Sequence, residues 1–525
     1  MNQSTLRSRS LTRVARALRP EACRSNVDAP KLERHASSSN PQDFSAAYTL
    51  FVFWGRDVMR RKLRILSILA FSFVCAACQI KPVQYAGTPA PQPRCSEIRT
   101  RIAIDPPVKA LGGEAELIES RDPLSRAILE SYRRAASSPL MRKQDETDRG
   151  PVSDSMLFLS GGSQNGAFGA GFLDQWAELR TQADKPGNLP RFRVITGIST
   201  GALQSTFAFL GDTDEIVGQY TITKESELLH PFAKSGLKGG STIQKAGAAL
   251  AVIRRGAIAE LEPLRETLRN LINPKRLEAV AREAAAGRFL LVGAVEMDTG
   301  DAYVFDLTKA ATSFVAGDAT MRDCYIEALM ASSSVPLAAL PVFIDGKMYI
   351  DGGARFGVLS DYSGALLEAA ALIPAQTKKN LFIIVNGTLE AGTVCHLRDC
   401  EGAPLPETPA GTVPQHAKWS FDGLAFRSMS ILINQSYRAS VYWATDQAKE
   451  RGFAPHFVRI DSESLNAHQA VVGIGPEADT RQSCAYWRKL DKQLDAPLEF
   501  HPRFMRCQID YGRNRREIAD WAELE

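Results

Sequence analysis

Short apolar runs alternate with helix-like patterns through the central part of the chain. The runs are SMLFLS (155–160), RFRVITG (191–197), RFLLVGAVEM (288–297), AYVFDL (302–307), KMYID (347–351) and LFIIVNG (381–387). Near-continuous apolar runs of this length are typical of strands buried on both faces. Because stretches with helical spacing separate several of them, the pattern predicts an α/β fold with a mainly parallel central sheet flanked by helices.

The pattern also predicts several other elements. Residues 212–288 are mostly helical in pattern, and residues 425–452 are expected to form one long helix that ends at Gly452. Asp345-Gly346 is expected to be a hairpin turn between two short strands. Residues 388–420 have the composition of an irregular insertion, and the chain shows no internal repeat.

The segment MRRKLRILSILAFSFVCAAC (59–78) has the layout of a secretory signal, with a basic start, an apolar stretch and small residues before Cys78. Its ending, VCAAC, resembles the lipobox of bacterial lipoproteins, in which the cysteine is acylated. We therefore expect an upstream extension (1–58), a signal peptide (59–77), lipidation of Cys78 and a Pro-rich tether (78–100). The protein would then be exported and anchored to a membrane of the cell envelope. Cleavage without lipidation, and an organelle transit peptide, are the alternatives.

Charge and cysteine content limit the partners. Residues 1–77 hold 13 of the 63 Lys and Arg but only 5 of the 59 Asp and Glu, so the rest of the chain is mildly acidic. That balance gives no reason to expect a nucleic-acid partner. Six cysteines follow Cys78, an even number that permits disulfides in an exported protein. Cys395 and Cys400 in CHLRDC are the best candidate pair, and a zinc site that includes His396 is the rival.

Two motifs carry the candidate chemistry. GISTG (197–201) lies between a strand-like run and a small-residue helix, which is the setting of a nucleophile elbow with Ser199 at its tip. SGGSQNG (160–166) joins another strand to another helix. Acyl transfer by a serine places negative charge on an oxygen, and the backbone N–H groups of Gly161, Gly162, Ser163 and Thr200 could stabilise it.

The general base is expected at Asp351. The sequence DGG (351–353) ends a predicted strand with a carboxylate. An aspartate can deprotonate a serine when it is partly desolvated and directed at Oγ. This chemistry needs no metal or cofactor, and GGSQNG fits neither of the glycine-rich nucleotide-binding patterns.

The ordered set GGSQNG, GISTG and DGG resembles the patatin-like phospholipase family, of the bacterial lipoprotein type. The segments 290–306 and 331–343 also resemble it, and the likeness spans roughly residues 150–462. It implies a three-layer patatin-like domain (101–462) with a C-terminal extension (463–525). It also implies a lipid or phospholipid ester substrate, a Ser199–Asp351 dyad, and an oxyanion loop that includes Gly166. Two residues depart from the family pattern: Ser163 replaces a glycine and Asn165 a basic residue.

Two other interpretations remain open. A Ser-His-Asp esterase would use Ser199 and Asp351 with His456 or His468. A lipid-anchored interaction protein would keep the fold without full activity, which the substitutions at Ser163 and Asn165 would explain. The favoured interpretation is a carboxylic ester hydrolase that acts on lipids through an acyl-enzyme on Ser199.

Overall fold

One sheet organises the chain. The computed structural model describes residues 94–102, 123–137, 150–182, 189–232, 256–359, 379–390, 400–401, 416–417 and 421–524. All of them belong to the unit Pro82–Glu525. The expected extension (1–58), signal peptide (59–77) and lipidation site (Cys78) lie outside the described residues, as do most of the tether and of the insertion.

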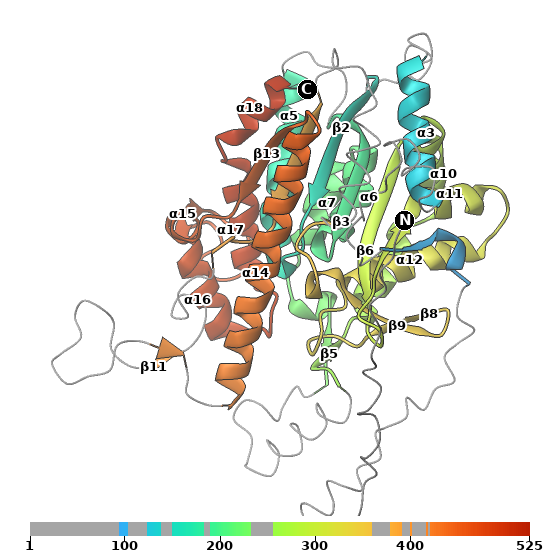
Figure 1. The fold of residues 1–525 in the computed structure, drawn as a ribbon. Coiled ribbons are helices and arrows are strands. Elements are labelled where there is room, and N and C mark those ends of the chain that lie inside the picture. Colours follow the sequence, from blue (N-terminus) through green and yellow to red (C-terminus); the bar gives the residue numbers. More distant parts are fainter. Residues whose placement is uncertain are drawn as a thin grey trace, which may run out of the picture. The chain divides into compact units, whose positions relative to one another are not determined.

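The sheet has nine strands in the described part of the chain, and its main path runs β1-β7-β6-β3-β2-β10-β13 (Figure 1). Its strands are β1 (Arg99–Arg101), β2 (Val152–Leu159), β3 (Arg191–Ile198), β6 (Phe289–Glu296), β7 (Ala302–Asp306), β8 (Val342–Ile344), β9 (Lys347–Asp351), β10 (Asn380–Val385) and β13 (Ala454–Arg459). The five strands β13, β10, β2, β3 and β6 are parallel, and β1, β7, β8 and β9 pair antiparallel. The predicted α/β fold with a mainly parallel sheet is confirmed.

Helices cover both faces of the sheet. Alternate residues of β2 enter different cores, with Leu157 and Leu159 on one face and Met156 and Phe158 on the other. The first core also contains residues of α5 (Gly166–Gln182), α6 (Thr200–Leu210), α12 (Thr320–Ser333) and α17 (Pro502–Arg513). The second contains residues of α3 (Pro123–Ser137) and α14 (Phe421–Glu450). Figure 1 shows α14 lying across its face of the sheet.

The described part of the chain also contains α7 (Thr213–Tyr220), α9 (Glu262–Leu271), α10 (Pro274–Ala285), α11 (Leu307–Val315), α15 (Ser462–Ala467), α16 (Cys484–Leu494) and α18 (Glu517–Leu524), and three two-stranded sheets: β4 (His230–Pro231) with β5 (Ala259–Glu260), β11 (Cys400–Glu401) with β12 (His416–Ala417), and β14 (Gln469–Ala470) with β15 (Gln482–Ser483). No helix of the described residues has both the length and the apolarity needed to cross a bilayer.

Local predictions held in two places. The long helix predicted over 425–452 is α14, and Gly452 follows it with φ 75°. The hairpin between β8 and β9 turns at Asp345 and Gly346, whose φ angles of 51° and 74° are both positive, as a tight two-residue turn requires.

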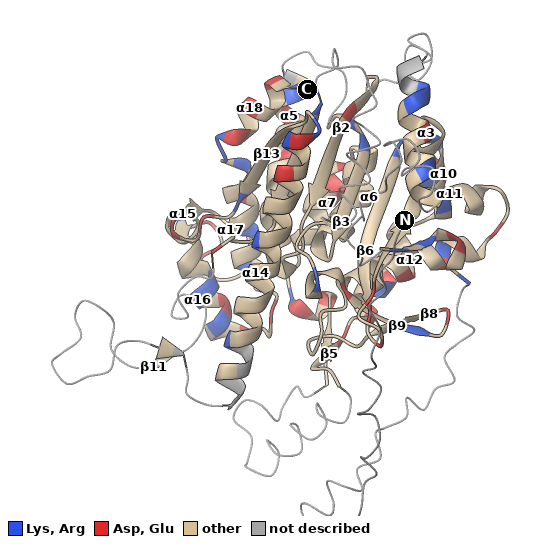
Figure 2. Ribbon diagram, in the orientation of Figure 1, with Lys and Arg blue, Asp and Glu red and all other residues tan. Residues whose placement is uncertain are grey.

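Charged residues are sparse along the central strands (Figure 2). Those of β2 and β3 lie near the amino ends of these strands and are paired: Arg193 contacts Asp154 at 2.7 Å, and Arg191 contacts Glu283 at 3.0 Å. The opposite, carboxyl ends of the parallel strands are the usual place for a ligand site in an α/β sheet.

Two disulfides join described segments, Cys95–Cys324 and Cys484–Cys507. Neither is the pair expected from spacing. Cys395 of that expected pair lies outside the described residues.

Candidate active site

Ser199 lies at a sharp turn between β3 and α6. Its φ of 53° and ψ of −124° are rare for a residue with a side chain. A methyl group added at Gly197 would lie 2.5 Å from the carbonyl oxygen of Gly201, and one at Gly201 would lie 2.4 Å from that of Leu159. The two flanking glycines are therefore required by close backbone contacts, which explains the GISTG pattern.

The end of α12 holds this turn in place. The amide of Ser199 donates to Oγ of Ser332 at 3.0 Å, and that hydroxyl donates in turn to the carbonyl of Gly293 at 2.7 Å. The Ser333 hydroxyl donates to the Ser199 carbonyl at 3.4 Å. The serines of ASSSVP, which the sequence marked only by family likeness, thus support the strained turn.

Strand register brings Asp351 to Ser199. The last residue of β3, Ile198, pairs with Gly293 of β6, and Asp351 of β9 pairs with the next residue, Ala294. Strand β9 therefore takes the position beside β6 where β3 stops. Ser199 and Asp351, far apart in sequence, meet for this reason.

The Asp351 carboxyl is buried, with 3% of the residue exposed. Burial raises its pKa from the usual 3.8 to about 7, although hydrogen bonding with Ser199 and with the Gly353 amide lowers it. The Gly353 amide donates to Oδ1 at 2.6 Å, whereas Oδ2 has no partner in hydrogen-bonding geometry among the described residues. A carboxylate with this pKa and one open oxygen is suited to accept a proton.

The glycine loop follows β2 and lies beside the elbow. A methyl group added at Gly162 would lie 1.7 Å from the carbonyl oxygen of Asn386. Ser163 has φ 52°, a conformation that favours glycine. The loop therefore accepts a serine in place of the family's glycine in a left-handed conformation, which costs about 1 kcal/mol or more.

The backbone amides of the expected oxyanion residues differ in whether they already donate a hydrogen bond within the protein. The amide of Gly161 donates to the carbonyl of Gly357 at 3.1 Å, and that of Gly166 donates within its own turn. Both are therefore occupied. Among the described residues, the amides of Gly162, Ser163 and Thr200 have no such partner, because they lie at the starts of a short turn and of α6. Gly166 instead allows the glycine loop to lie close to α6, since a methyl group there would lie 2.1 Å from Oγ1 of Thr200.

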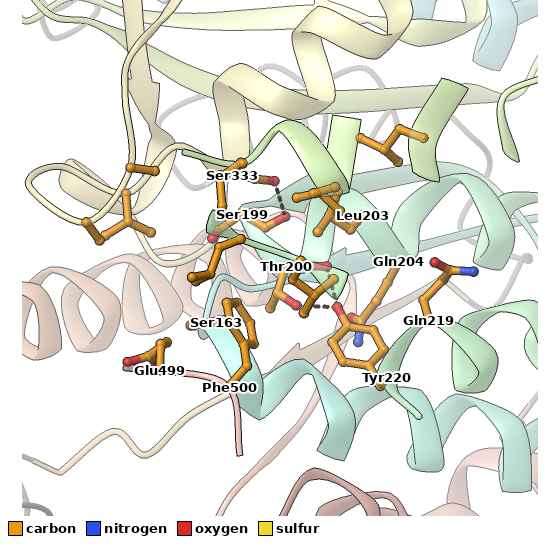
Figure 3. Close-up of a pocket in the computed structure, with 18 of the residues that line it drawn as sticks. Ser163, Ser199, Thr200, Leu203, Gln204, Gln219, Tyr220, Ser333, Glu499 and Phe500 are labelled. Carbon is orange, nitrogen blue, oxygen red and sulfur yellow. Dashed lines mark hydrogen bonds between the residues drawn. The ribbon is translucent and has the colours of Figure 1, made fainter. Parts of the chain in front are cut away.

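A cavity of about 120 Å³ opens at Ser199 (Figure 3). Its wall is largely apolar and includes Leu203, Leu229, Leu264 and Leu271. Among the described residues, no group of His, Cys, Asp and Glu side chains is arranged to hold a metal ion.

The two histidines of the triad alternative lie elsewhere. His456 is hydrogen-bonded to Asn380, the first residue of β10, whereas Ser199 follows the last residue of β3. Because β10 and β3 run parallel in the sheet, His456 lies at the opposite end of the strands from Ser199. His468 contacts Asp510 at 2.7 Å. Neither lines the cavity at Ser199, so the geometry does not support a Ser-His-Asp triad.

Comparison with known proteins agrees with this geometry. Residues 157–360, which contain the loop, the elbow and Asp351, match the family described as Patatin-like phospholipase.

This part of the chain is a patatin-like phospholipase domain.

The chain is also similar to a solved structure, VipD from Legionella pneumophila, with 12% identity and a TM-score of 0.23. That match covers 45% of this chain and half the length of VipD. No curated protein matches the chain.

The patatin-like domain has supporting residues that motifs did not reveal. Asn386 donates through Nδ2 to the Ser160 carbonyl at 2.9 Å and to Gln204 Oε1 at 3.1 Å. Gln204 donates to the Gly166 carbonyl at 2.7 Å. These buried amides hold the glycine loop against the elbow. The only sequence signal was a polar residue immediately after a buried strand.

Tyr437 of α14 is a second residue that the sequence did not indicate. A methyl group added at Gly161 would lie 2.0 Å from its hydroxyl oxygen, and one at Gly353 would lie 3.1 Å from it. The Tyr437 hydroxyl thus lies between the glycine loop and the DGG loop. Burial and the nearby Asp351 carboxyl raise the pKa of Tyr437 above its usual range, so this side chain stays neutral.

Proposed function

We propose that this patatin-like protein is a serine lipid acyl hydrolase that cleaves ester-linked acyl chains by a Ser199–Asp351 dyad. The observation that carries the proposal is a strained serine that lines a leucine-rich cavity and has a buried carboxyl beside it. An apolar cavity suits an acyl chain, and the family match supports a lipid ester as substrate.

In the first half-reaction, the Asp351 carboxylate takes the proton of Ser199 as Oγ attacks the ester carbonyl carbon. The amides of Gly162, Ser163 and Thr200 stabilise the oxyanion. The intermediate collapses, the ester C–O bond breaks, and the alcohol leaves with the proton from Asp351. Water, deprotonated by Asp351, then attacks the acyl-enzyme, which releases the acid and returns the proton to Ser199.

Turnover of a lipid extract, with products identified by mass, tests the proposal. Wild type should release fatty acid, Ser199→Ala should lose at least about 1000-fold in rate, and Asp351→Asn at least about 100-fold. Equal turnover by all three proteins would contradict the assignment.

Labelling by a serine-directed fluorophosphonate separates the enzyme from an inactive interaction protein. We expect labelling of wild type that Ser199→Ala abolishes. Absence of labelling in wild type, together with no turnover, would favour the interaction protein.

We also propose that the protein is an exported lipoprotein anchored through Cys78. The two disulfides support export, because such bonds persist in oxidising compartments. Metabolic labelling with a radioactive fatty acid should mark the wild type and not Cys78→Ser. Labelling of both proteins, or of neither, would argue against this anchor.

A further inference from the structure

The C-terminal elements, which follow the matched residues 157–360, form part of the cavity at Ser199. Helix α17 packs along α5, the helix that follows the glycine loop. The short segment that precedes α17 places Glu499 and Phe500 on the cavity wall (Figure 3). The site is therefore built by two separate parts of the chain.

A single carboxylate holds this segment. The amides of Leu498, Glu499 and Phe500 donate to the Glu225 carboxylate at 2.9, 2.7 and 2.9 Å. Hydrogen bonds to a charged acceptor are stronger than neutral ones, and three successive amides on one carboxylate fix the backbone direction. Glu225 shortly precedes Leu228 and Leu229, which line the same cavity.

The same part of the chain contacts the glycine loop. The His501 amide donates to Gln164 Oε1 at 3.3 Å, and Gln508 Nε2 donates to Asn165 Oδ1 at 2.7 Å. Asn165 is the residue that replaces the family's basic residue. In this protein its side chain therefore accepts a hydrogen bond from helix α17.

We propose that the segment 498–501 is the specificity-determining wall of the acyl cavity, with Phe500 limiting the acyl groups that fit and Glu225 holding the wall in place. This inference rests on the proposed lipid hydrolase function. Its physical basis is that a rigid apolar wall discriminates chains by their length, at about 10- to 200-fold per methylene at the limit of the pocket.

The test measures kcat/KM for p-nitrophenyl esters from acetyl to palmitoyl. Phe500→Ala should shift the ratio of kcat/KM for long-chain esters to kcat/KM for short-chain esters at least tenfold toward long chains. Phe500→Leu should shift it less. Glu225→Gln should broaden the length preference because it loosens the segment. The matched control is Glu227→Gln, since among the described residues the Glu227 carboxylate accepts hydrogen bonds from Thr223 and Lys224 of its own turn and none from the segment 498–501.

A parallel change across the whole ester series would overturn the inference and leave the hydrolase assignment intact. Binding of free fatty acids of increasing length to the Ser199→Ala protein, measured by displacement of a fluorescent fatty acid, gives a readout without turnover. Phe500→Ala in that background should extend the preferred length. If the length preference for free fatty acids is unchanged in that variant, the role of the segment 498–501 in chain-length selection is wrong, even if wild type hydrolyses no ester. Thermal unfolding checks that each variant is folded.

Discussion

The buried carboxyl of Asp351 sets the pH range in which Ser199 can be activated. A general base must be deprotonated, and its pKa is about 7 because burial disfavours the charge. We expect kcat/KM for a soluble ester to fall about tenfold per pH unit below 7 and to level off above it. Rates measured from pH 5 to 9 check this. A plateau that extends down to pH 5 would show that the base is a carboxyl with an ordinary pKa.

Space at Gly161 is limited by Tyr437. The added methyl group of Gly161→Ala would lie 2.0 Å from the Tyr437 hydroxyl but 3.2 Å from its ring carbon Cζ and 3.1 Å from Cβ of Ser199. Gly161→Ala should therefore displace the loop and lower kcat/KM at least about 100-fold. Removing the hydroxyl in the double variant with Tyr437→Phe should restore part of the loss.

Gly218→Ala is the matched control, because apart from its chain neighbours and the backbone of its own helix, no atom of the described residues lies within 4 Å of the position that its methyl group would take. We expect it to keep full activity. If Tyr437→Phe fails to rescue Gly161→Ala, the loss arises from the loop backbone rather than from contact with the tyrosine.

At the scale of elements, the sequence predicted what depends on local pattern. Buried strands, the long helix α14, the hairpin at Asp345 and the glycine turns all follow from nearby residues. Tyr437 was missed because one tyrosine on a helix gives no sign of which loops it contacts. The role of 498–501 was missed for the same reason, since its three amides bond to Glu225, more than 270 positions earlier.

Disulfide pairing shows the same limit. The structure joins Cys95 to Cys324, 229 positions apart, a pair that spacing did not indicate. Cys395 of the expected Cys395–Cys400 pair lies outside the described residues, so that pair stays a prediction. Cysteine positions in three dimensions depend on the strand order, which no cysteine motif in the chain encodes.

The Cys484–Cys507 disulfide joins α16 to α17, the helix that directly follows the segment 498–501. Its residues are 23 apart, and closing a loop of about this size contributes about 3 kcal/mol to stability. The double variant Cys484→Ala/Cys507→Ala should lower the free energy of unfolding by about that amount. Urea unfolding followed by tryptophan fluorescence measures it. Coincident transitions of variant and wild type would contradict the expected effect.

At the scale of the whole molecule, the proposed base places a charge where the fold disfavours it. Asp351 lies against strands of a sheet that is buried on both faces, so its raised pKa links activity to the free energy of unfolding. Between the unfolded pKa near 3.8 and the folded pKa near 7, the folded state binds more protons than the unfolded chain. The contribution of Asp351 to stability is therefore full below pH 3.8 and is lost as pH rises through 7.

Asp351→Asn should reveal this link, because the amide keeps the size of the side chain and never ionises. At pH 8 the variant should be more stable than wild type by up to a few times 1.4 kcal/mol, the free energy of about one pKa unit, and the difference should shrink toward pH 4. Urea unfolding across that range measures it. Ser199→Ala is the control: it also loses hydrolysis but keeps the carboxyl, so it should retain the pH dependence of wild type. A stability difference between Asp351→Asn and wild type that does not change with pH would mean that Asp351 has the same pKa in the folded and unfolded chain, and the raised pKa of the proposed base would then be wrong.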